Sequence, residues 1–402
     1  MNVQIFPSIA KGTVAAPPSK SMAHRLLIAA GLAEGTSIIR GVAPSQDVLA
    51  TIDCLTALGA VCHHENETVT VTGLGGKILT HSPHLPCREC GSTLRFFLPI
   101  ALLSDEKTTL TGSERLLLRP MSVYEELCKQ NNLLYIANQS GITVQGKLTS
   151  GEYTVAGNVS SQFISGLLFA LPLLSGDSKI IITEKVESRS YLNLTVKALA
   201  DFGVTVKWEN ERTLLIPGSQ QYRARNTTVE GDYSNAAFFA ALSYLDGQVS
   251  VMGLDKASLQ GDRVYQNYFE ALQNGTPTLS LADCPDLGPV LFALAGALHG
   301  AHFTDTARLR IKESDRGTAM AEELKKLGIR TDVLENEIHV YPAKITPPSE
   351  SLSAHNDHRI VMALSLLLTK CGGKIEGAEA VNKSMPDFFE RLASLGILLT
   401  VS

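Results

Sequence analysis

Lysine and arginine side chains occur at several points of the sequence beside serine, glycine or asparagine. The first group is Ser19-Lys20-Ser21, followed by Arg25. Arginine forms paired hydrogen bonds with carboxylates and phosphates, whereas lysine acts as a point charge. Such a set is typical of a protein that binds a small molecule with several negative charges. The basic residues in these positions are Lys20, Arg25, Arg95, Arg119, Arg308, Lys312, Arg316, Arg359 and Lys383.

Polar and acidic residues accompany these bases. Ser160-Ser161-Gln162 offers two hydroxyls and an amide to a phosphate monoester or a sugar-like ring. Gly91 lets a ligand approach the backbone closely. Asp286 and Glu313 are candidates to move protons. A surface charge or a helix cap explains any one of these residues, but the set predicts acid–base chemistry on an anion.

Two groups of cysteine and histidine do not predict a metal site. Cys87 and Cys90 form one C-x-x-C pair, and a zinc site of that kind needs a second pair. The seven cysteines are irregularly spaced, which favours free thiols over a disulfide framework. His63-His64, followed by Glu65, is predicted to be a polar loop between strands. We therefore expect no bound metal.

The elements that must hold these residues follow a repeating pattern. Six units are predicted, each with an apolar helix, a β-rich stretch, a second helix and a further strand. The apolar helices are rich in Ala, Leu, Ile and Phe on every side, so we expect them to be buried. They are predicted at residues 21–33, 92–103, 161–174, 234–245, 285–298 and 357–368.

Each apolar helix starts with polar or charged residues. Serine and aspartate are ordinary caps when one helix is considered alone. The free N–H groups of a helix start also favour anions, so six such starts together predict an electropositive cleft in an acidic protein. The second helices mostly end at Gly or Asn and are predicted at residues 47–58, 123–129, 192–202, 264–273, 318–327 and 387–395.

The fourth unit is shorter than the others. After Asn274-Gly275 the chain soon reaches Asp283, so we expect strands to be missing there. The whole chain has 402 residues, which is too long for one ordinary core and predicts two domains.

Composition narrows the class of protein. With 44% hydrophobic and 19% charged residues, the chain has the profile of a folded protein. A net charge of -5 disfavours a general nucleic-acid binder. The apolar runs are too short for a transmembrane helix, and residues 1–20 lack the pattern of a signal peptide. We expect a cytoplasmic protein with neither a membrane nor a nucleic acid as partner.

These groups, in this order, resemble the 5-enolpyruvylshikimate-3-phosphate synthase family along nearly the whole chain. The most specific matches are Ser19-Lys20-Ser21 with Arg25, Ser160-Ser161-Gln162, Pro285-Asp286, Lys312-Glu313-Ser314-Asp315-Arg316 and Asn356-Asp357-His358-Arg359. The resemblance implies an α/β (α+β) fold, a two-domain inside-out α/β barrel with six βαβαββ repeats, buried parallel helices and a truncated fourth repeat. It implies a lower domain of residues 1–20 and 230–402, an upper domain of residues 21–229, and an active site in the cleft between them.

The resemblance also implies roles for single residues. Asp286 would take the proton from the shikimate 5-hydroxyl, Glu313 would protonate the methylene carbon of phosphoenolpyruvate, and Lys20 would share in proton transfer. The contacts implied for shikimate 3-phosphate are Lys20, Ser21, Arg25, Ser160, Ser161, Ser188, Tyr191, Asp286, Arg308 and Lys312. Those implied for phosphoenolpyruvate are Lys20, Gly91, Arg119, Gln162, Arg316, Arg359 and Lys383.

The implied reaction is addition followed by elimination of phosphate, catalysed by a monomer without metal or organic cofactor. Glu89 stands where many members have Asn, which could alter the fit of phosphoenolpyruvate or of the inhibitor glyphosate. Arg308 stands where some members have Asn. The alternatives are UDP-N-acetylglucosamine enolpyruvyl transferase, whose loop cysteine is missing between Leu110 and Arg119, a catalytically inactive module of the same fold, and an RNA-processing cyclase.

Overall fold

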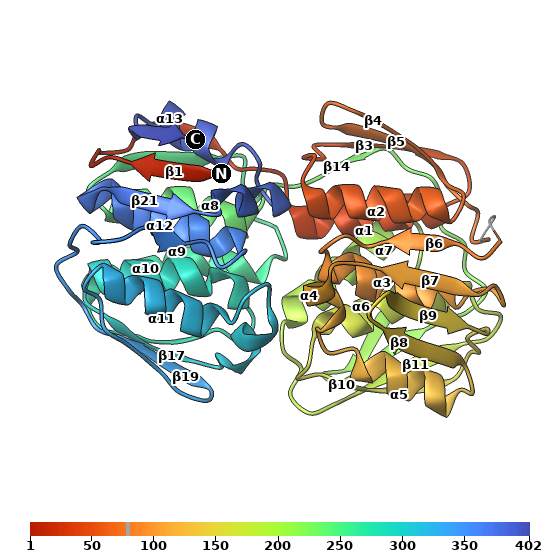
Figure 1. The fold of residues 1–402 in the computed structure, drawn as a ribbon. Coiled ribbons are helices and arrows are strands. Elements are labelled where there is room, and N and C mark those ends of the chain that lie inside the picture. The colour runs from red at the N-terminus through yellow and green to blue at the C-terminus, as the bar shows by residue number, and fades with distance from the viewer. Residues whose placement is uncertain (78–80) are drawn as a thin grey trace. The chain divides into compact units, whose positions relative to one another are not determined.

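The computed structural model describes residues 1–77 and 81–402 and divides into two compact units (Figure 1). Unit 1 comprises Met1–Pro17 and Gly231–Ser402, and unit 2 comprises Pro18–Glu230. Helices and strands alternate along both units, and each sheet is open. The α/β class is therefore confirmed, whereas the closed-barrel arrangement stays a prediction.

Unit 2 contains three apolar helices, α1 (Lys20–Leu32), α3 (Gly91–Ala101) and α6 (Ser161–Ala170), which are buried along almost their whole length. The second helices of the three repeats are α2 (Gln46–Ala57), α5 (Ser122–Gln130) and α7 (Arg189–Asp201). A short helix, α4 (Glu114–Leu117), precedes α5, and the 3-10 turn η1 (Leu171–Leu173) extends α6.

Three four-stranded sheets complete unit 2 in the described residues. The first has the order β14 (Thr227–Thr228), β3 (Thr36–Arg40), β5 (Thr68–Thr72) and β4 (Val61–Glu65). The second is β6 (His84–Pro86), β7 (Thr108–Thr111), β9 (Gly141–Gln145) and β8 (Leu134–Asn138). The third is β10 (Glu152–Ala156), β11 (Ser178–Thr183), β13 (Thr213–Ile216) and β12 (Lys207–Asn210). The first pair of each sheet is parallel and the other pairs are antiparallel.

Unit 1 repeats this plan. Its apolar helices are α8 (Tyr233–Ala241), α10 (Gly288–Ala297) and α12 (His358–Cys371), and its second helices are α9 (Tyr265–Asn274), α11 (Arg316–Lys326) and α13 (Phe388–Ser394). One sheet is β16 (Thr278–Ser280), β17 (Ala301–Thr304), β19 (Glu337–Val340) and β18 (Thr331–Val333). Another is β20 (Leu352–Ser353), β21 (Gly373–Glu376), β1 (Asn2–Ile5) and β22 (Leu399–Val401). The 3-10 turns are η2 (Leu242–Tyr244), η3 (Gly261–Val264), η4 (Pro285–Leu287), η5 (Ala307–Ile311) and η6 (Ala378–Lys383).

The six apolar helices confirm the predicted repeat, and their polar starts act as caps. Ser19 Oγ accepts a hydrogen bond from Met22 N, and Asp232 and Asp357 accept in the same way at α8 and α12. Such caps satisfy backbone donors that a helix start leaves unpaired. The prediction of a loop at His63-His64 is wrong, because both residues lie in β4, which pairs with β5.

The shortened fourth repeat is visible in the sheets. Within the described residues, β15 (Gln248–Met252) pairs only with β2 (Lys11–Ala15), so this sheet has two strands where the other five have four. The Ser243 hydroxyl donates to Val249 O and accepts from Val249 N, each at 3.0 Å. Beside β15 lies an open hollow of about 550 Å³ whose lining includes Tyr233, Tyr244 and Tyr265.

Membrane-spanning helices were also considered. Among residues 1–77 and 81–402, no helix is both long and apolar enough to cross a bilayer.

Candidate active site

In unit 2, Lys20 begins helix α1 and pairs with the first turn of α2. Its Nζ lies 2.8 Å from Asp47 Oδ2, and both side chains are mostly buried. Ser19 and Ser45 cap the two helices, which fixes the backbone on either side of this ion pair. The pair holds the lysine in one position, as required of a residue that contacts a substrate.

Arg25 lies one turn further along α1 and is buried. Its Nε donates to Thr195 Oγ1 at 2.8 Å and its Nη2 donates to Tyr191 O at 3.0 Å. The guanidinium also lies over the rings of Phe96 and Tyr191. Burial lowers the pKa of Arg25 to about 10, against a smaller raising effect of Tyr191. The side chain is therefore still a cation at neutral pH, held rigidly by neutral partners.

Gly91 begins α3, and its backbone is in close contact with Arg119. A Cβ at this position would lie 2.6 Å from Arg119 Nη1 and 3.6 Å from Arg95 Nη1. Only glycine lets both guanidinium groups approach this helix start. Two cations beside free backbone N–H groups form an anion-binding arrangement.

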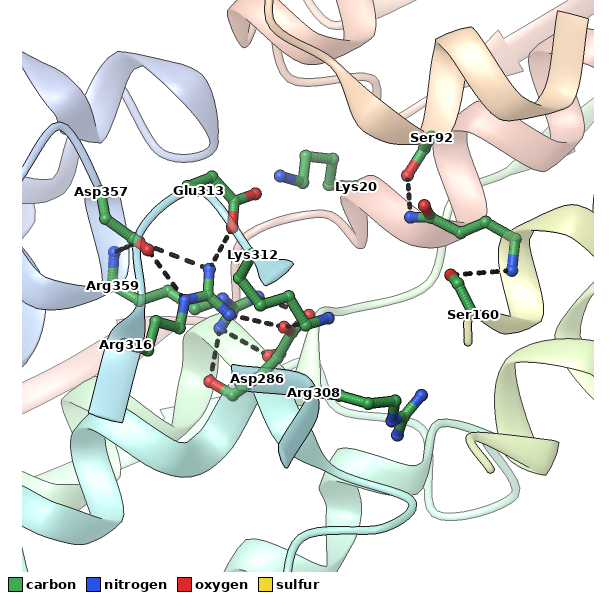
Figure 2. Close-up of polar contacts among 12 residues, drawn as sticks. Lys20, Ser92, Ser160, Asp286, Arg308, Lys312, Glu313, Arg316, Asp357 and Arg359 are labelled. Carbon is green, nitrogen blue, oxygen red and sulfur yellow. Dashed lines mark hydrogen bonds and ion pairs between the residues drawn. The ribbon is translucent and has the colours of Figure 1, made fainter. Parts of the chain in front are cut away.

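Gln162 connects the starts of α3 and α6. Its Nε2 donates to Ser92 Oγ at 2.8 Å and its Oε1 accepts from Arg95 Nη1 at 2.6 Å, while its backbone N bonds the capping Ser160 (Figure 2). Ser161 is the buried first residue of α6. These bonds orient the hydroxyl and amide groups that the sequence singled out.

Ser188 precedes α7 with φ of 54°, in the left-handed region that a serine rarely adopts. Strained backbone of this kind is concentrated at functional sites. The residue is buried, and α7 continues with Tyr191, whose ring lies under Arg25.

In unit 1, Arg316 lies at the centre of a charged cluster (Figure 2). Its Nη1 lies 2.8 Å from Asp286 Oδ1, its Nη2 lies 2.7 Å from Glu313 Oε2, and its Nε lies 2.9 Å from Asp357 Oδ2. Arg316 and Asp357 are fully buried. Burial alone would lower the pKa of Arg316, but Asp357, Glu313 and Asp286 raise it above its usual value.

Asp286 contacts three cations. Besides Arg316, Lys312 Nζ lies 3.3 Å from its Oδ1 and Arg359 Nη2 lies 3.3 Å from its Oδ2. Burial alone would raise the pKa of Asp286, but Arg359, Lys312 and Arg316 hold it well below its usual value. Arg359 also donates to Ser234 Oγ at 2.7 Å, which fixes its position at the start of α12.

The remaining basic residues of unit 1 bind backbone carbonyls. Arg308 Nη2 donates to Ala282 O at 2.6 Å, and Lys383 Nζ donates to Asn356 O at 2.8 Å. Arg308 thus reaches the segment before Asp286, and Lys383 reaches the segment before Asp357.

Glu323 of α11 supports the loop that leads to Asp357. Its carboxylate accepts from Ser353 N at 3.0 Å, contacts His355 Nε2 at 2.9 Å and pairs with Lys326 Nζ at 3.1 Å. Burial would raise the pKa of Glu323, but His355, the Ser353 amide and Lys326 lower it below the usual 4.5.

We expect Glu323→Gln to destabilise the protein at neutral pH, with a difference from the wild type that shrinks below about pH 4.5. A depressed folded-state pKa contributes stability above the unfolded pKa, and protonation removes it as the pH falls. Urea unfolding at pH 7 and pH 4 measures this difference. Glu322→Gln, at the exposed neighbouring position, is the control and should cost little at either pH. An equal loss at both pH values for Glu323→Gln would contradict the assignment.

Several partners were missed by the sequence analysis. Asp47 and Thr195 hold Lys20 and Arg25, and Ser234 holds Arg359. Asp47 follows the cap Ser45 and has the pattern of an ordinary acidic helix start. Pairing between separate helices leaves no signal in one sequence, so only the structure identifies these partners.

The comparisons with known proteins agree with this set of residues. The family model of EPSP synthase (3-phosphoshikimate 1-carboxyvinyltransferase) matches residues 7–392. The chain belongs to the EPSP synthase family. A 3-phosphoshikimate 1-carboxyvinyltransferase of Clostridium kluyveri is 41% identical over 416 residues, covering 98% of this chain and 97% of the relative. One from Clostridium perfringens (strain ATCC 13124) is 40% identical over 422 residues, covering 99% of both chains.

Solved structures support the fold of this family member. An EPSP synthase from Acinetobacter baumannii superimposes with a TM-score of 0.82 at 22% identity, covering 100% of this chain and 99% of that one. The enolpyruvyl transferase NikO from Streptomyces tendae gives a TM-score of 0.79 at 15% identity, with 99% and 98% coverage. The family is thus shown by sequence and the fold by structure.

Proposed function

We propose that the chain transfers the enolpyruvyl group of phosphoenolpyruvate to the 5-hydroxyl of shikimate 3-phosphate and releases phosphate, a step of aromatic amino acid biosynthesis. Family membership over residues 7–392 supports this activity. The observation that carries the assignment of roles is that Asp286 and Glu313, the expected base and acid, bind the same guanidinium of Arg316. One rigid group thereby orients both proton-transfer residues.

We propose that Asp286 accepts the proton of the 5-hydroxyl as its oxygen attacks C2 of phosphoenolpyruvate. Glu313 gives a proton to C3, which forms a tetrahedral ketal. Loss of phosphate from C2 and of a proton from C3 then forms the enol ether. Phosphate and carboxylate groups of the substrates compete for Lys312, Arg316 and Arg359, which raises the pKa of Asp286 and makes it a better base.

We assign substrate contacts within each unit. In unit 2, Lys20, Ser21, Arg25, Ser160, Ser161, Ser188 and Tyr191 bind shikimate 3-phosphate, and Lys20, Gly91, Arg119 and Gln162 bind phosphoenolpyruvate. In unit 1, Asp286, Arg308 and Lys312 bind the first substrate, and Arg316, Arg359 and Lys383 bind the second. Arginine and lysine placed on helix starts are suited to these anions.

The proposal is tested by phosphate release from phosphoenolpyruvate with a single acceptor present. We expect release with shikimate 3-phosphate and none with UDP-N-acetylglucosamine. Release with the second acceptor alone would assign the chain to the sister activity. Release with neither would favour an inactive module of the same fold.

Gly91→Ala is expected to raise the KM for phosphoenolpyruvate by about tenfold or more, since overpacking costs ~1–3 kcal/mol. The new methyl group would displace Arg119, whose Nη1 lies 2.6 Å from its position. Steady-state kinetics measure the change. Gly275→Ala is the control, because a Cβ there meets nothing within 4 Å. An unchanged KM for Gly91→Ala would remove Arg119 from the proposed site.

We also propose that the chain works as a monomer in a reducing, cytoplasmic compartment. All seven cysteines are free thiols, which suits a reducing environment. Both expected proton-transfer residues lie in one unit of one chain, so a second copy is not needed for them.

A further inference from the structure

Three buried side chains of different chemistry meet beside Lys20 in unit 2. They are His24 of α1, Asp47 of α2 and Cys90, the residue that caps α3. Each offers one ligand atom, and these atoms all lie within 4.8 Å of one another. Imidazole, carboxylate and thiolate are the three ligand types that proteins use for zinc.

The spacing of two ligand atoms is close to that of a tetrahedral site. Cys90 Sγ lies 3.8 Å from His24 Nε2. Bonds of ~2.3 Å to sulfur and ~2.0 Å to nitrogen at a tetrahedral angle place the two ligand atoms about 3.6 Å apart. A small movement of either side chain is therefore enough to hold an ion between them.

The imidazole is oriented from its other side. His24 Nδ1 lies 2.7 Å from Thr51 Oγ1, which in turn lies 2.9 Å from Thr93 Oγ1. With Nδ1 donating to Thr51, Nε2 carries the lone pair and faces Cys90. An outer hydrogen bond of this kind accompanies most metal-binding histidines. Burial, with Lys20 and Arg25 nearby, lowers the pKa of His24 well below its usual value, so the ring is neutral and available as a ligand.

We propose that His24, Asp47 and Cys90 form a binding site for a thiophilic divalent cation such as Zn²⁺. On binding, the Cys90 thiol gives its proton to solvent and a metal–sulfur bond forms, without any oxidation. The thiolate and the Asp47 carboxylate then balance the two positive charges of the ion. The site lies outside the residues assigned to either substrate.

Occupancy of the site has a consequence for Lys20. Asp47 binds Lys20 Nζ at 2.8 Å, and the ion competes for the same carboxylate. Zn²⁺ is therefore expected to displace Lys20 and to inhibit the enzyme. This inhibition rests on the proposed function, whereas the binding of the ion does not.

Cadmium titration of the full chain tests the site, because a Cd²⁺–thiolate bond gives an ultraviolet charge-transfer band. We expect the band in the wild type, with one ion at saturation, and its loss in Cys90→Ser, whose hydroxyl can still cap α3 by accepting from Thr93 N. Cys62→Ser, on β4, is the matched control and should keep the band. The cross-strand group His302, Glu337 and His339 has no thiol, so an ion there adds no band.

Zinc affinity, measured by competition with a chromophoric chelator, gives a second readout. Cys90→Ser should weaken it by at least about tenfold, since loss of even an outer partner costs that much. A wild type without the band, or a band unchanged in Cys90→Ser, would overturn the proposal. The second result would place the ion at Cys54 and Cys87, whose thiols contact each other.

Phosphate release with and without Zn²⁺ tests the inhibition separately. We expect inhibition that a chelator reverses in the wild type and that Cys90→Ser resists. Binding without inhibition would overturn the link to Lys20. A metal-free chain with no activity would reject the proposed function, and the cadmium band would still decide the site.

Discussion

Glu313→Gln lowers kcat by roughly 10²- to 10⁴-fold, the usual contribution of a positioned general acid, while the protein stays folded. The amide oxygen of glutamine can still accept from Arg316 Nη2, which now lies 2.7 Å from the Glu313 carboxylate. The amide cannot give a proton to C3 of phosphoenolpyruvate. Phosphate release at saturating substrate measures kcat, and circular dichroism measures the fold.

Glu322→Gln is the matched control for this change. Glu322 lies on α11 near the same cluster and its side chain is mostly exposed. Its kcat should equal that of the wild type. A kcat of Glu313→Gln within twofold of the wild type would assign the proton on C3 to another group.

Arg316→Met is expected to reduce the free energy of unfolding by about 3–5 kcal/mol, because it leaves a buried carboxylate without its cation. Asp357 is fully buried and Arg316 Nε lies 2.9 Å from it, so this carboxylate bears most of the cost. Activity should be lost as well, since Asp286 and Glu313 lose the group that orients them. Urea unfolding and phosphate release measure the two effects.

A second substitution separates charge from packing. Adding Asp357→Asn to Arg316→Met removes the uncompensated charge and should restore part of the lost stability. Arg310→Met is the control, because Arg310 is exposed on η5 and donates to Leu334 O. If the double variant were no more stable than Arg316→Met, lost packing would explain the cost and the charge argument would fail.

The helices were predictable from sequence because local signals agreed. Helix α1 is apolar on every side, starts after the cap Ser19 and is buried as expected. The strand at His63-His64 was missed for a physical reason. β4 pairs only with β5 at one edge of its sheet and even Val61 is exposed, so no apolar alternation marks it.

The contacts of the site residues were less predictable than their positions. The sequence identified Lys20 and Arg316 as basic residues at helix starts. That Lys20 pairs with Asp47, or that Arg316 touches carboxylates from three separate segments, depends on how distant segments pack. Such pairings are tertiary contacts, and a single sequence carries no record of them.

The two-stranded sheet of the fourth repeat has a consequence for behaviour at high protein concentration. An open strand edge offers unpaired N–H and C=O groups to strands of other molecules, which is a route to aggregation. At Val249 of β15, the Ser243 hydroxyl already occupies both groups. A single side chain from the 3-10 turn η2 therefore blocks, at this residue, the strand addition that a shortened repeat would otherwise invite.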